Sequence, residues 1–218
     1  MFQLNKCAMQ RILFCISFLL VTLLVYAQDD IPNYRSKREN FLKMVEKDAR
    51  ADLATFTLGG LDEAAGKDPL PAASVVGYSS DSIMLQKDNI KVVIKAGVFD
   101  KTKHKILLYD EKYVTKIDNK PYYGVIGKMP LTTIATLQVT VGRDTIVIPA
   151  AAYTDLHNPA FCRVGANAKT KCNVGVYFSK DNHRMYIYML NGDGKEGYEV
   201  TWVIQDKKYL LRVIDWEF

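Results

Sequence analysis

The sequence predicts a mainly β fold: an antiparallel β-sandwich or an open barrel-like sheet, with one N-terminal α-helix after a cleaved signal peptide. Three observations support this prediction. Apolar and polar residues alternate with a period of two over most of the chain from Ile83 onward. Short turns rich in Gly, Asn and Asp separate the alternating runs. The N-terminus joins basic residues to a single apolar run. About eight to ten short strands with few helices are typical of sandwiches and barrels.

The N-terminal segment has the features of a secretory signal peptide. Lys6 and Arg11 precede an apolar and small-residue run from Ile12 to Tyr26, and Ala27 supplies the small residue at the cleavage point. This run is shorter than the ~20 residues that a spanning helix needs. We therefore expect cleavage after Ala27 and export to the periplasm or the exterior, with an uncleaved anchor as the alternative. The sequence leaves open whether Met9 or the first methionine is the initiator.

The rest of the chain divides into three parts. The expected organisation is a signal peptide over 1–27, a helical segment over 28–60, a linker or loop over 61–82 and an antiparallel β domain over 83–218. The linker is rich in Gly, Pro, Ala and Ser and has no sustained period.

A helical pattern lies between the signal peptide and the linker. Apolar residues recur every fourth position at Phe41, Val45, Ala49 and Leu53. Asn33 or Ser36 is the expected N-cap, and Gly59-Gly60 the expected end. We expect this helix to cover one face of a sheet, with recruitment of a partner as the alternative.

Period-two runs predict the strands. The expected strands are 83–86, 90–95, 104–109, 113–117, 136–141, 145–148, 172–178, 184–190, 198–204 and 209–216. The last four follow one another through short turns, so they should form an antiparallel meander.

Composition and charge exclude several classes of protein. The 218 residues are 49% hydrophobic and 24% charged, which excludes collagen, wholesale disorder and a polytopic membrane protein. Removal of the signal peptide takes away two basic residues and lowers the formal net charge from +5 to +3. The remaining lysines are scattered among acidic residues, so the basic stripe needed for nucleic acid is missing. After cleavage we expect neither a nucleic-acid partner nor an integral membrane protein.

Two cysteines remain after cleavage, because Cys7 and Cys15 are removed with the signal peptide. In an oxidising compartment Cys162 and Cys172 are expected to form a disulfide. A catalytic or redox cysteine is the alternative, but the sequence contains no Cys-x-x-Cys motif.

Tyrosines form the most distinctive candidate binding surface. Tyr177, Tyr186 and Tyr188 should share one face of the C-terminal sheet, because side chains alternate along each strand and a short turn makes the two strands antiparallel neighbours. Their opposite face should carry Val176, Phe178, Met185 and Ile187. Tyr122 and Tyr123 lie in a predicted loop between Pro121 and Gly124. An exposed aromatic platform suits sugar rings or apolar ligands; the alternative is packing under the N-terminal helix.

Oxygen-bearing side chains around the turn after Leu190 are candidate calcium ligands. They belong to Asn191, Asp193, Glu196 and Glu199. Plain hairpin-turn chemistry is the alternative, because the spacing does not match an EF-hand loop. Asp155 and His157 could similarly hold a metal or belong to an ordinary turn before Pro159.

The C-terminal stretch resembles the ending of a loose group of uncharacterised exported bacterial β-rich proteins. The residues that carry the resemblance are Gly192-Asp193-Gly194, 198–204, Lys208-Tyr209 and 212–215. The likeness covers about a third of the mature chain, and it implies no activity.

These features predict an exported, non-enzymatic binding or interaction module without a cofactor. Candidate partners are a glycan, a small apolar ligand or another envelope protein. The alternative is a hydrolase acting on envelope or glycan substrates, with Asp155 and Glu199 as acid and base. Neither a nucleophile-elbow motif nor a phosphate-binding glycine loop is present in the sequence.

Overall fold

The computed structural model describes residues 33–34, 46–58, 64–124, 127–165, 168–192 and 197–216. All of them lie in the compact unit that spans Pro32–Phe218. The expected signal peptide lies outside the described residues.

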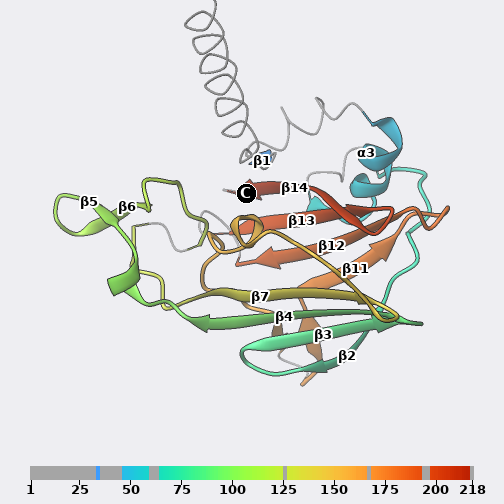
Figure 1. Ribbon diagram of the computed structural model, residues 1–218, viewed down its shortest axis with the longest axis horizontal. Coiled ribbons are helices and arrows are strands. Elements are labelled where there is room, and N and C mark those ends of the chain that lie inside the picture. The colour runs from blue at the N-terminus through green and yellow to red at the C-terminus, as the bar shows by residue number, and fades with distance from the viewer. Residues whose placement is uncertain are drawn as a thin grey trace, which may run out of the picture. The chain divides into compact units, whose positions relative to one another are not determined.

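Four C-terminal strands, drawn in orange to red in Figure 1, form a five-stranded sheet together with one short N-terminal strand; it is called the C-terminal sheet. Its meander consists of β11 (Val174–Phe178), β12 (Arg184–Asn191), β13 (Tyr198–Gln205) and β14 (Lys208–Trp216). Neighbouring strands are antiparallel, as predicted. The short strand β1 (Asn33–Tyr34) adds to β14 in parallel orientation.

A second five-stranded sheet, the second sheet, has the order β2-β3-β4-β7-β8. Its strands are β2 (Ser74–Tyr78), β3 (Ser82–Lys87), β4 (Ile90–Val98), β7 (Thr132–Val141) and β8 (Asp144–Ile146). Leu85, Val92 and Val139 are opposite one another and buried, whereas Gln86 and Lys91 on the other side are exposed. One side of this sheet therefore faces the core and the other faces solvent.

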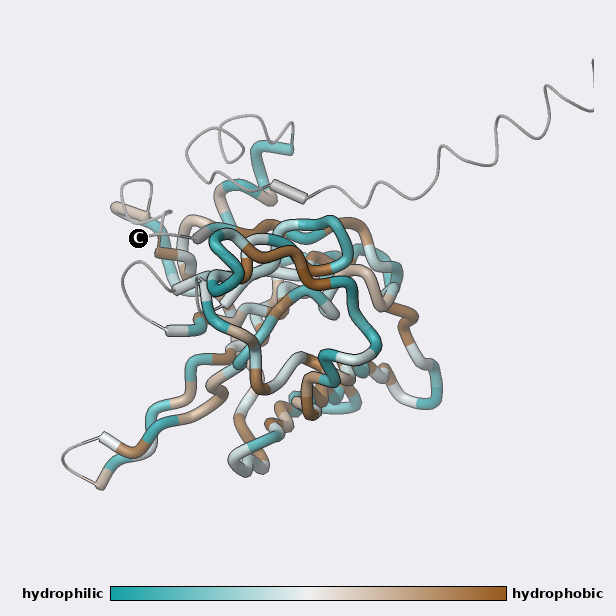
Figure 2. The backbone as a smooth tube through the Cα atoms, turned by 90° about the vertical axis from the view of Figure 1, so that its left-hand side faces the viewer, coloured by the Kyte–Doolittle hydropathy of each residue, from teal (hydrophilic) through white to brown (hydrophobic). Residues whose placement is uncertain are grey.

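Two small hairpins and short helical pieces complete the fold. The hairpins are β5 (Ile106–Tyr109) with β6 (Tyr113–Ile117), and β9 (Cys162–Val164) with β10 (Thr170–Cys172). The helical pieces are α3 (Lys47–Ala54) and the 3₁₀ turns η3 (Lys101–Lys103) and η4 (Ala150–Ala152). Figure 2 shows hydrophobic (brown) and hydrophilic (teal) residues interspersed along the described part of the tube.

The C-terminal sheet is buried on both sides. On its inner side lie Trp202 and Ile187, and the Lys87 ammonium of the second sheet lies 4.5 Å from the Phe178 ring on this side. On its outer side α3 packs Ala49 and Leu53 against Tyr186, with Val203 and Val213 in the same cluster. The layers are thus α3, the C-terminal sheet and the second sheet (Figure 1). The predicted fold class is confirmed as a mainly β, antiparallel fold.

One segment joins the two sheets at a corner. The Ala73 N–H donates to the Val176 carbonyl at 2.8 Å, and the Phe178 N–H donates to the Pro71 carbonyl at 2.9 Å. Immediately afterwards the chain becomes β2, which pairs with β3 of the second sheet. The edge of β11 is therefore covered near Ala72, while β2 forms an edge of the other sheet.

The N-terminal half differs from expectation in three places. Asn33 does not cap a helix, because it pairs with Arg212 as part of β1. The helix α3 follows Glu46 and ends at Ala54, before the expected Gly59-Gly60, and Phe41 and Val45 of its predicted stripe lie outside the described residues. The predicted linker contains β2, whose pattern was hidden by a bulge between Val75 and Gly77.

Candidate functional site

An open groove separates β2 from β10. Up to Ala73 the chain pairs with β11, and β10 lies directly before β11 in sequence, so continued pairing would have placed β2 beside β10. Instead β2 turns to β3, and a wedge-shaped groove of about 560 Å³ opens between the two strands. The residues that line it are Val75, Val76, Gly77, Tyr78, Thr170 and Cys172.

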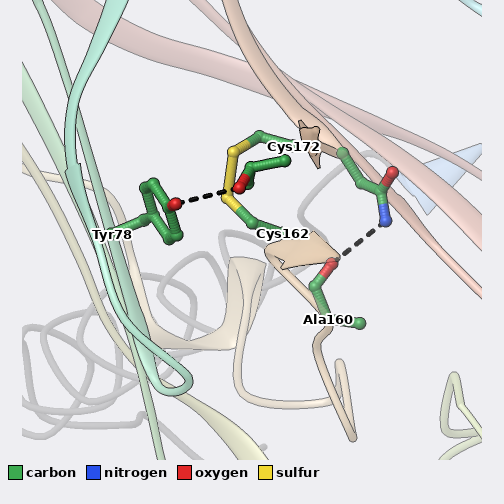
Figure 3. The surroundings of a disulfide bond; sticks show 6 residues. Tyr78, Ala160, Cys162 and Cys172 are labelled. Atoms are coloured by element: carbon green, nitrogen blue, oxygen red, sulfur yellow. Dashed lines mark hydrogen bonds between the residues drawn. A yellow bond between two sulfur atoms is a disulfide. The ribbon is translucent and has the colours of Figure 1, made fainter. Parts of the chain in front are cut away.

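A hydrogen bond crosses the groove. The hydroxyls of Tyr78 and Thr170 hydrogen-bond to each other at 3.0 Å, as the dashed line from Tyr78 in Figure 3 shows. Both groups are side chains, so the two backbones are held apart by the length of a tyrosine side chain. The groove is thus bridged at this point by two side chains, and no backbone hydrogen bond between described residues closes it.

The wall formed by β9 and β10 is held by the predicted disulfide. Cys162 and Cys172 are directly opposite each other in the hairpin and are bonded (Figure 3). Adjacent cross-strand positions bring the two sulfur atoms within bonding range. At the base of the hairpin, the Asn173 side-chain amide donates to the Ala160 carbonyl at 3.3 Å. The wall is therefore cross-linked rather than held by two short strands alone.

The groove is apolar and exposed. Val76 and Tyr78 are each 54% exposed, and Val164, opposite Thr170 on the same face of the hairpin, is 72% exposed. Isolated exposed apolar residues are ordinary on protein surfaces, but a contiguous group of them marks an interaction site. These residues therefore form the strongest candidate site in the described part of the chain.

Uncompensated positive charge lies beside the groove. Between the two cysteines the chain carries Arg163, Lys169 and Lys171 and no acidic residue. All three are exposed, and none makes an ion pair with the described residues. The hairpin therefore presents a net positive charge to an approaching partner.

The predicted tyrosine face exists, but it is covered. Tyr177 is opposite Tyr186, and Tyr188 lies on the same side, as predicted. Phe56, just after α3, stacks on Tyr177 with 4.3 Å between ring centroids. Tyr186 is 0% exposed and Tyr188 is 8% exposed. The expectation of an exposed aromatic platform is therefore wrong, because the N-terminal helix buries these rings as core.

Hydroxyl groups fix this buried face to the helix. The Tyr186 hydroxyl donates to Asp52 at 2.8 Å, and the Tyr188 hydroxyl donates to Glu199 at 2.9 Å. Glu199 also accepts from the Leu58 N–H at 2.9 Å. Burial, reinforced by the neighbouring carboxylates, raises the pKa of both phenols well above the usual value, so they remain hydrogen-bond donors.

Tyr122 and Tyr123 are also buried and do not form a surface. The Tyr122 hydroxyl donates to the Val114 carbonyl at 3.1 Å. The Arg212 guanidinium lies 5.9 Å from the centre of the Tyr123 ring, which also packs near Tyr198. Their predicted role in binding is replaced by a role in packing.

Asp155 and Glu199 do not form an acid–base pair. Asp155 makes a two-point ion pair with Arg212, with both N–O distances at 2.6 Å. Arg212 is opposite Trp202 on β13, and Glu199 is three residues from Trp202, so the two groups point to opposite sides of the sheet. A glycosidase needs its two carboxyl groups about 5 to 10 Å apart across one bond. This pair is separated by the sheet itself.

The candidate calcium ligands do not converge where they are described. Asn191 accepts from the Ala160 N–H at 2.7 Å on the inner side of the sheet, while Glu199 points to the outer side. Asp193 and Glu196 lie outside the described residues. Within the described ranges, no group of three or more His, Cys, Asp or Glu side chains is arranged to hold a metal ion.

The His157 side chain is buried among aromatic side chains. The imidazole is 1% exposed, neither ring nitrogen makes a hydrogen bond of good geometry, and the rings of Phe99 and Tyr122 pack edge-on at 5.1 and 5.8 Å. Burial lowers its pKa to about 4, partly opposed by the charge of Asp155 and the backbone of Thr132. Because Asp155 is bound to Arg212, the predicted Asp155–His157 metal pair is not formed.

The other two histidines pair separately with exposed carboxylates. His104 Nδ1 lies 2.7 Å from Asp118, and His183 Nδ1 lies 2.9 Å from Asp206. The hydrogen bond to Asp206 raises the pKa of His183. Both arrangements are typical of turns and supply no shared site.

Val76, Tyr78 and Thr170 were missed by sequence reasoning. The Val-Val-Gly-Tyr run between Pro71 and Ser79 contains β-favouring residues, and that signal could have indicated a strand. Its apposition to the cysteine hairpin depends on a pairing some 92 residues apart in sequence.

Among the helices that the structure describes, none has the length and apolar character to cross a membrane. Comparisons of this chain with protein-family models, with curated proteins and with solved structures find no match.

Proposed function

We propose that this protein is an exported, non-enzymatic binding module that recognises another polypeptide through the groove between β2 and β10. The observation that carries the proposal is the exposed apolar lining of this groove, together with its disulfide-linked wall. Export rests on the signal-peptide pattern over 1–27.

The shape of the groove favours a chain-like partner. Pockets for small molecules enclose most of the ligand surface, commonly 70–90%. The groove beside β2 is open to solvent, and the side chains of Val76 and Tyr78 in its lining are exposed. A small ligand in it would therefore remain largely hydrated. A polypeptide can instead lie along the groove and contact both walls.

The position of the carboxylates also favours binding over hydrolysis. The two candidates for acid and base are on opposite sides of the C-terminal sheet, and each is already bound to groups of the fold. Asp155 holds Arg212, and Glu199 holds Tyr188 and the Leu58 N–H. Their contacts therefore serve packing.

The test is a binding screen of the mature, oxidised protein against peptide, glycan and lipid arrays. The informative variant is Val76→Ser with Tyr78→Ser, and the control is Leu131→Ser with Val147→Ser, which removes two apolar residues elsewhere that are even more exposed. We expect peptide binding that falls at least tenfold in the groove variant and is unchanged in the control.

Thermal unfolding of both variants separates binding from folding. Both should unfold within a few degrees of the native protein, because the altered side chains are exposed. Ligands that bind the control and the groove variant equally would contradict the proposal. Binding of glycans or lipids alone at this groove would assign the partner to another class.

A further inference from the structure

We infer that the groove receives an extended peptide that adds as a strand to the free edge of β2, with apolar side chains facing the groove and acidic side chains on the opposite face, toward the basic residues of the β9–β10 hairpin. This inference rests on the proposed function and specifies how the partner is bound. Four observations on the described residues carry it.

The first observation is the free edge of β2. The strand pairs only with β3, and no backbone hydrogen bond joins it to β10 among the described residues. The outer strands of the two five-stranded sheets differ from β2: the segment around Ala72 pairs with β11, β1 pairs with Arg212 and Val213 of β14, and β8 has three residues. An open strand edge carries backbone donors and acceptors that another chain can pair with.

The second observation is the width of the groove. A strand placed between two others needs roughly 9–10 Å between them, twice the spacing of neighbouring strands. A tyrosine side chain and its hydrogen bond to Thr170 span the gap between β2 and β10. β2 and β10 are therefore not directly paired, and a peptide that enters between them displaces the Tyr78–Thr170 hydrogen bond.

The third observation is the absence of protective charge on β2. Its sequence, Ser-Val-Val-Gly-Tyr, has no charged residue and no proline, although exposed edges are commonly guarded by lysine or proline. The bulge between Val75 and Gly77 leaves Val76 as an extra residue whose side chain is 54% exposed. Bulges at edges often re-aim a side chain toward a partner.

The fourth observation is the charge of the hairpin. Arg163, Lys169 and Lys171 make no ion pair with the described residues. Arg163 and Lys171 are opposite each other on the face of the hairpin away from Thr170 and Cys172, which line the groove. Complementary charge on the partner accelerates encounter and disfavours basic competitors. Because side chains alternate along a strand, a peptide with apolar residues at every second position can place acidic residues between them.

The probe is a library of fluorescein-labelled eight-residue peptides. Val, Ile, Leu or Phe occupies alternate positions, and Glu and Thr occupy the positions between them. Three control libraries share this design. One carries Lys in place of Glu. The other two carry N-methyl groups on alternate backbone nitrogens, one library for the odd positions and one for the even positions. Fluorescence anisotropy with the mature, oxidised protein measures affinity, and hydrogen exchange locates the protected amides.

We expect members of the first library to bind and to protect amides of β2. N-methylation in one of the two phases should weaken binding at least tenfold, because it removes the donors that face β2. Replacement of Glu by Lys should also weaken binding, and the preference for Glu should decrease in high salt. The protein variant Val76→Asp should lose at least tenfold in affinity, whereas Val147→Asp should not.

Three results would overturn strand addition: no binding by any member, equal binding by both N-methylated forms, or protection confined to other strands. The proposed function has a separate readout. If the screen finds a ligand whose affinity depends on Tyr78 but no peptide of this library binds, the proposed binding function is supported and strand addition to β2 is contradicted. If the affinity of no ligand depends on Tyr78, both the proposed binding function and strand addition are contradicted.

Discussion

At the scale of single residues, the buried polar groups of this fold are divided between satisfied and unsatisfied ones. Arg212 is mostly satisfied: it binds Asp155 at two points and donates to the Ala152 carbonyl at 3.0 Å, while its Nε makes no hydrogen bond with the described residues. Trp202 donates to the same carbonyl at 2.8 Å. His157 is an unsatisfied group, because its two buried ring nitrogens have no hydrogen-bond partner among the described residues.

Folding stability should depend on pH through His157. The folded pKa is about 4 and the ordinary value is 6.5, so the unfolded chain binds the proton more readily between these values. The contribution of the neutral His157 imidazole to the free energy of unfolding is therefore fully present above about pH 6.5. It decreases as the pH drops toward 4, by up to about 3 kcal/mol. Urea unfolding at a series of pH values measures this.

The variant His157→Leu isolates that contribution from the titration of carboxylates. It should remove about 3 kcal/mol of the pH dependence between pH 6.5 and 4, while His183→Gln should leave the fall intact, since His183 is exposed and its pKa is raised. An unchanged pH profile in His157→Leu would show that the imidazole is not the titrating group.

Breaking the buried ion pair should be costly. Arg212→Met leaves Asp155 without its counter-charge, and loss of one partner of a buried pair costs about 3–5 kcal/mol. Lys180→Met, which breaks an exposed pair with Asp68, should cost less than about 1 kcal/mol. Chemical denaturation of the two variants compares them directly, and equal losses would contradict the structural role of Arg212.

At the scale of elements, α3 is held by the sheet that it covers. It has eight residues and no side-chain N-cap bond, so it would be marginal as an isolated helix. Leu53 is fully buried against the C-terminal sheet, and Phe56 extends the contact by stacking on Tyr177. The tyrosines of the sheet therefore act as the platform for this helix.

Replacing Tyr186 and Tyr188 together by Ser should destabilise the protein by several kcal/mol, as expected for buried rings. Tyr109→Ser provides the control, because Tyr109 on β5 is exposed and its change should lie within about 0.5 kcal/mol. Urea unfolding gives both values. Near-native stability of the double variant would mean that the helix does not bury this face in solution.

At the scale of the whole molecule, two sheets share a corner without closing into a barrel. The segment through Ala72 and Ala73 pairs with β11, and its continuation as β2 belongs to the second sheet. This change of partner creates the groove beside the disulfide hairpin. The candidate site is thus a consequence of topology and not of any local motif.

Export remains a prediction for the whole chain. Cleavage after Ala27 should give a product that begins at Gln28, because the apolar run is short and ends in a small residue. Intact-mass analysis of the protein recovered from the cell envelope checks this. A membrane-retained species that still contains residues 12–26 would contradict it.

Local patterns predict most of the strands from Ile83 onward, the C-terminal meander, the disulfide and the shared face of Tyr177, Tyr186 and Tyr188. Each follows from local rules: alternation, turn residues, or the removal of other cysteines. These rules miss β9, and they merge β10 and β11 into one strand over 172–178. What covers the tyrosine face follows from the packing of the complete fold, because alternation groups side chains on one side without specifying the element that buries them. The parallel pairing of Asn33 and the apposition of Tyr78 to Thr170 join positions distant in the chain. Such pairings depend on the packing of the whole fold, which no local pattern encodes.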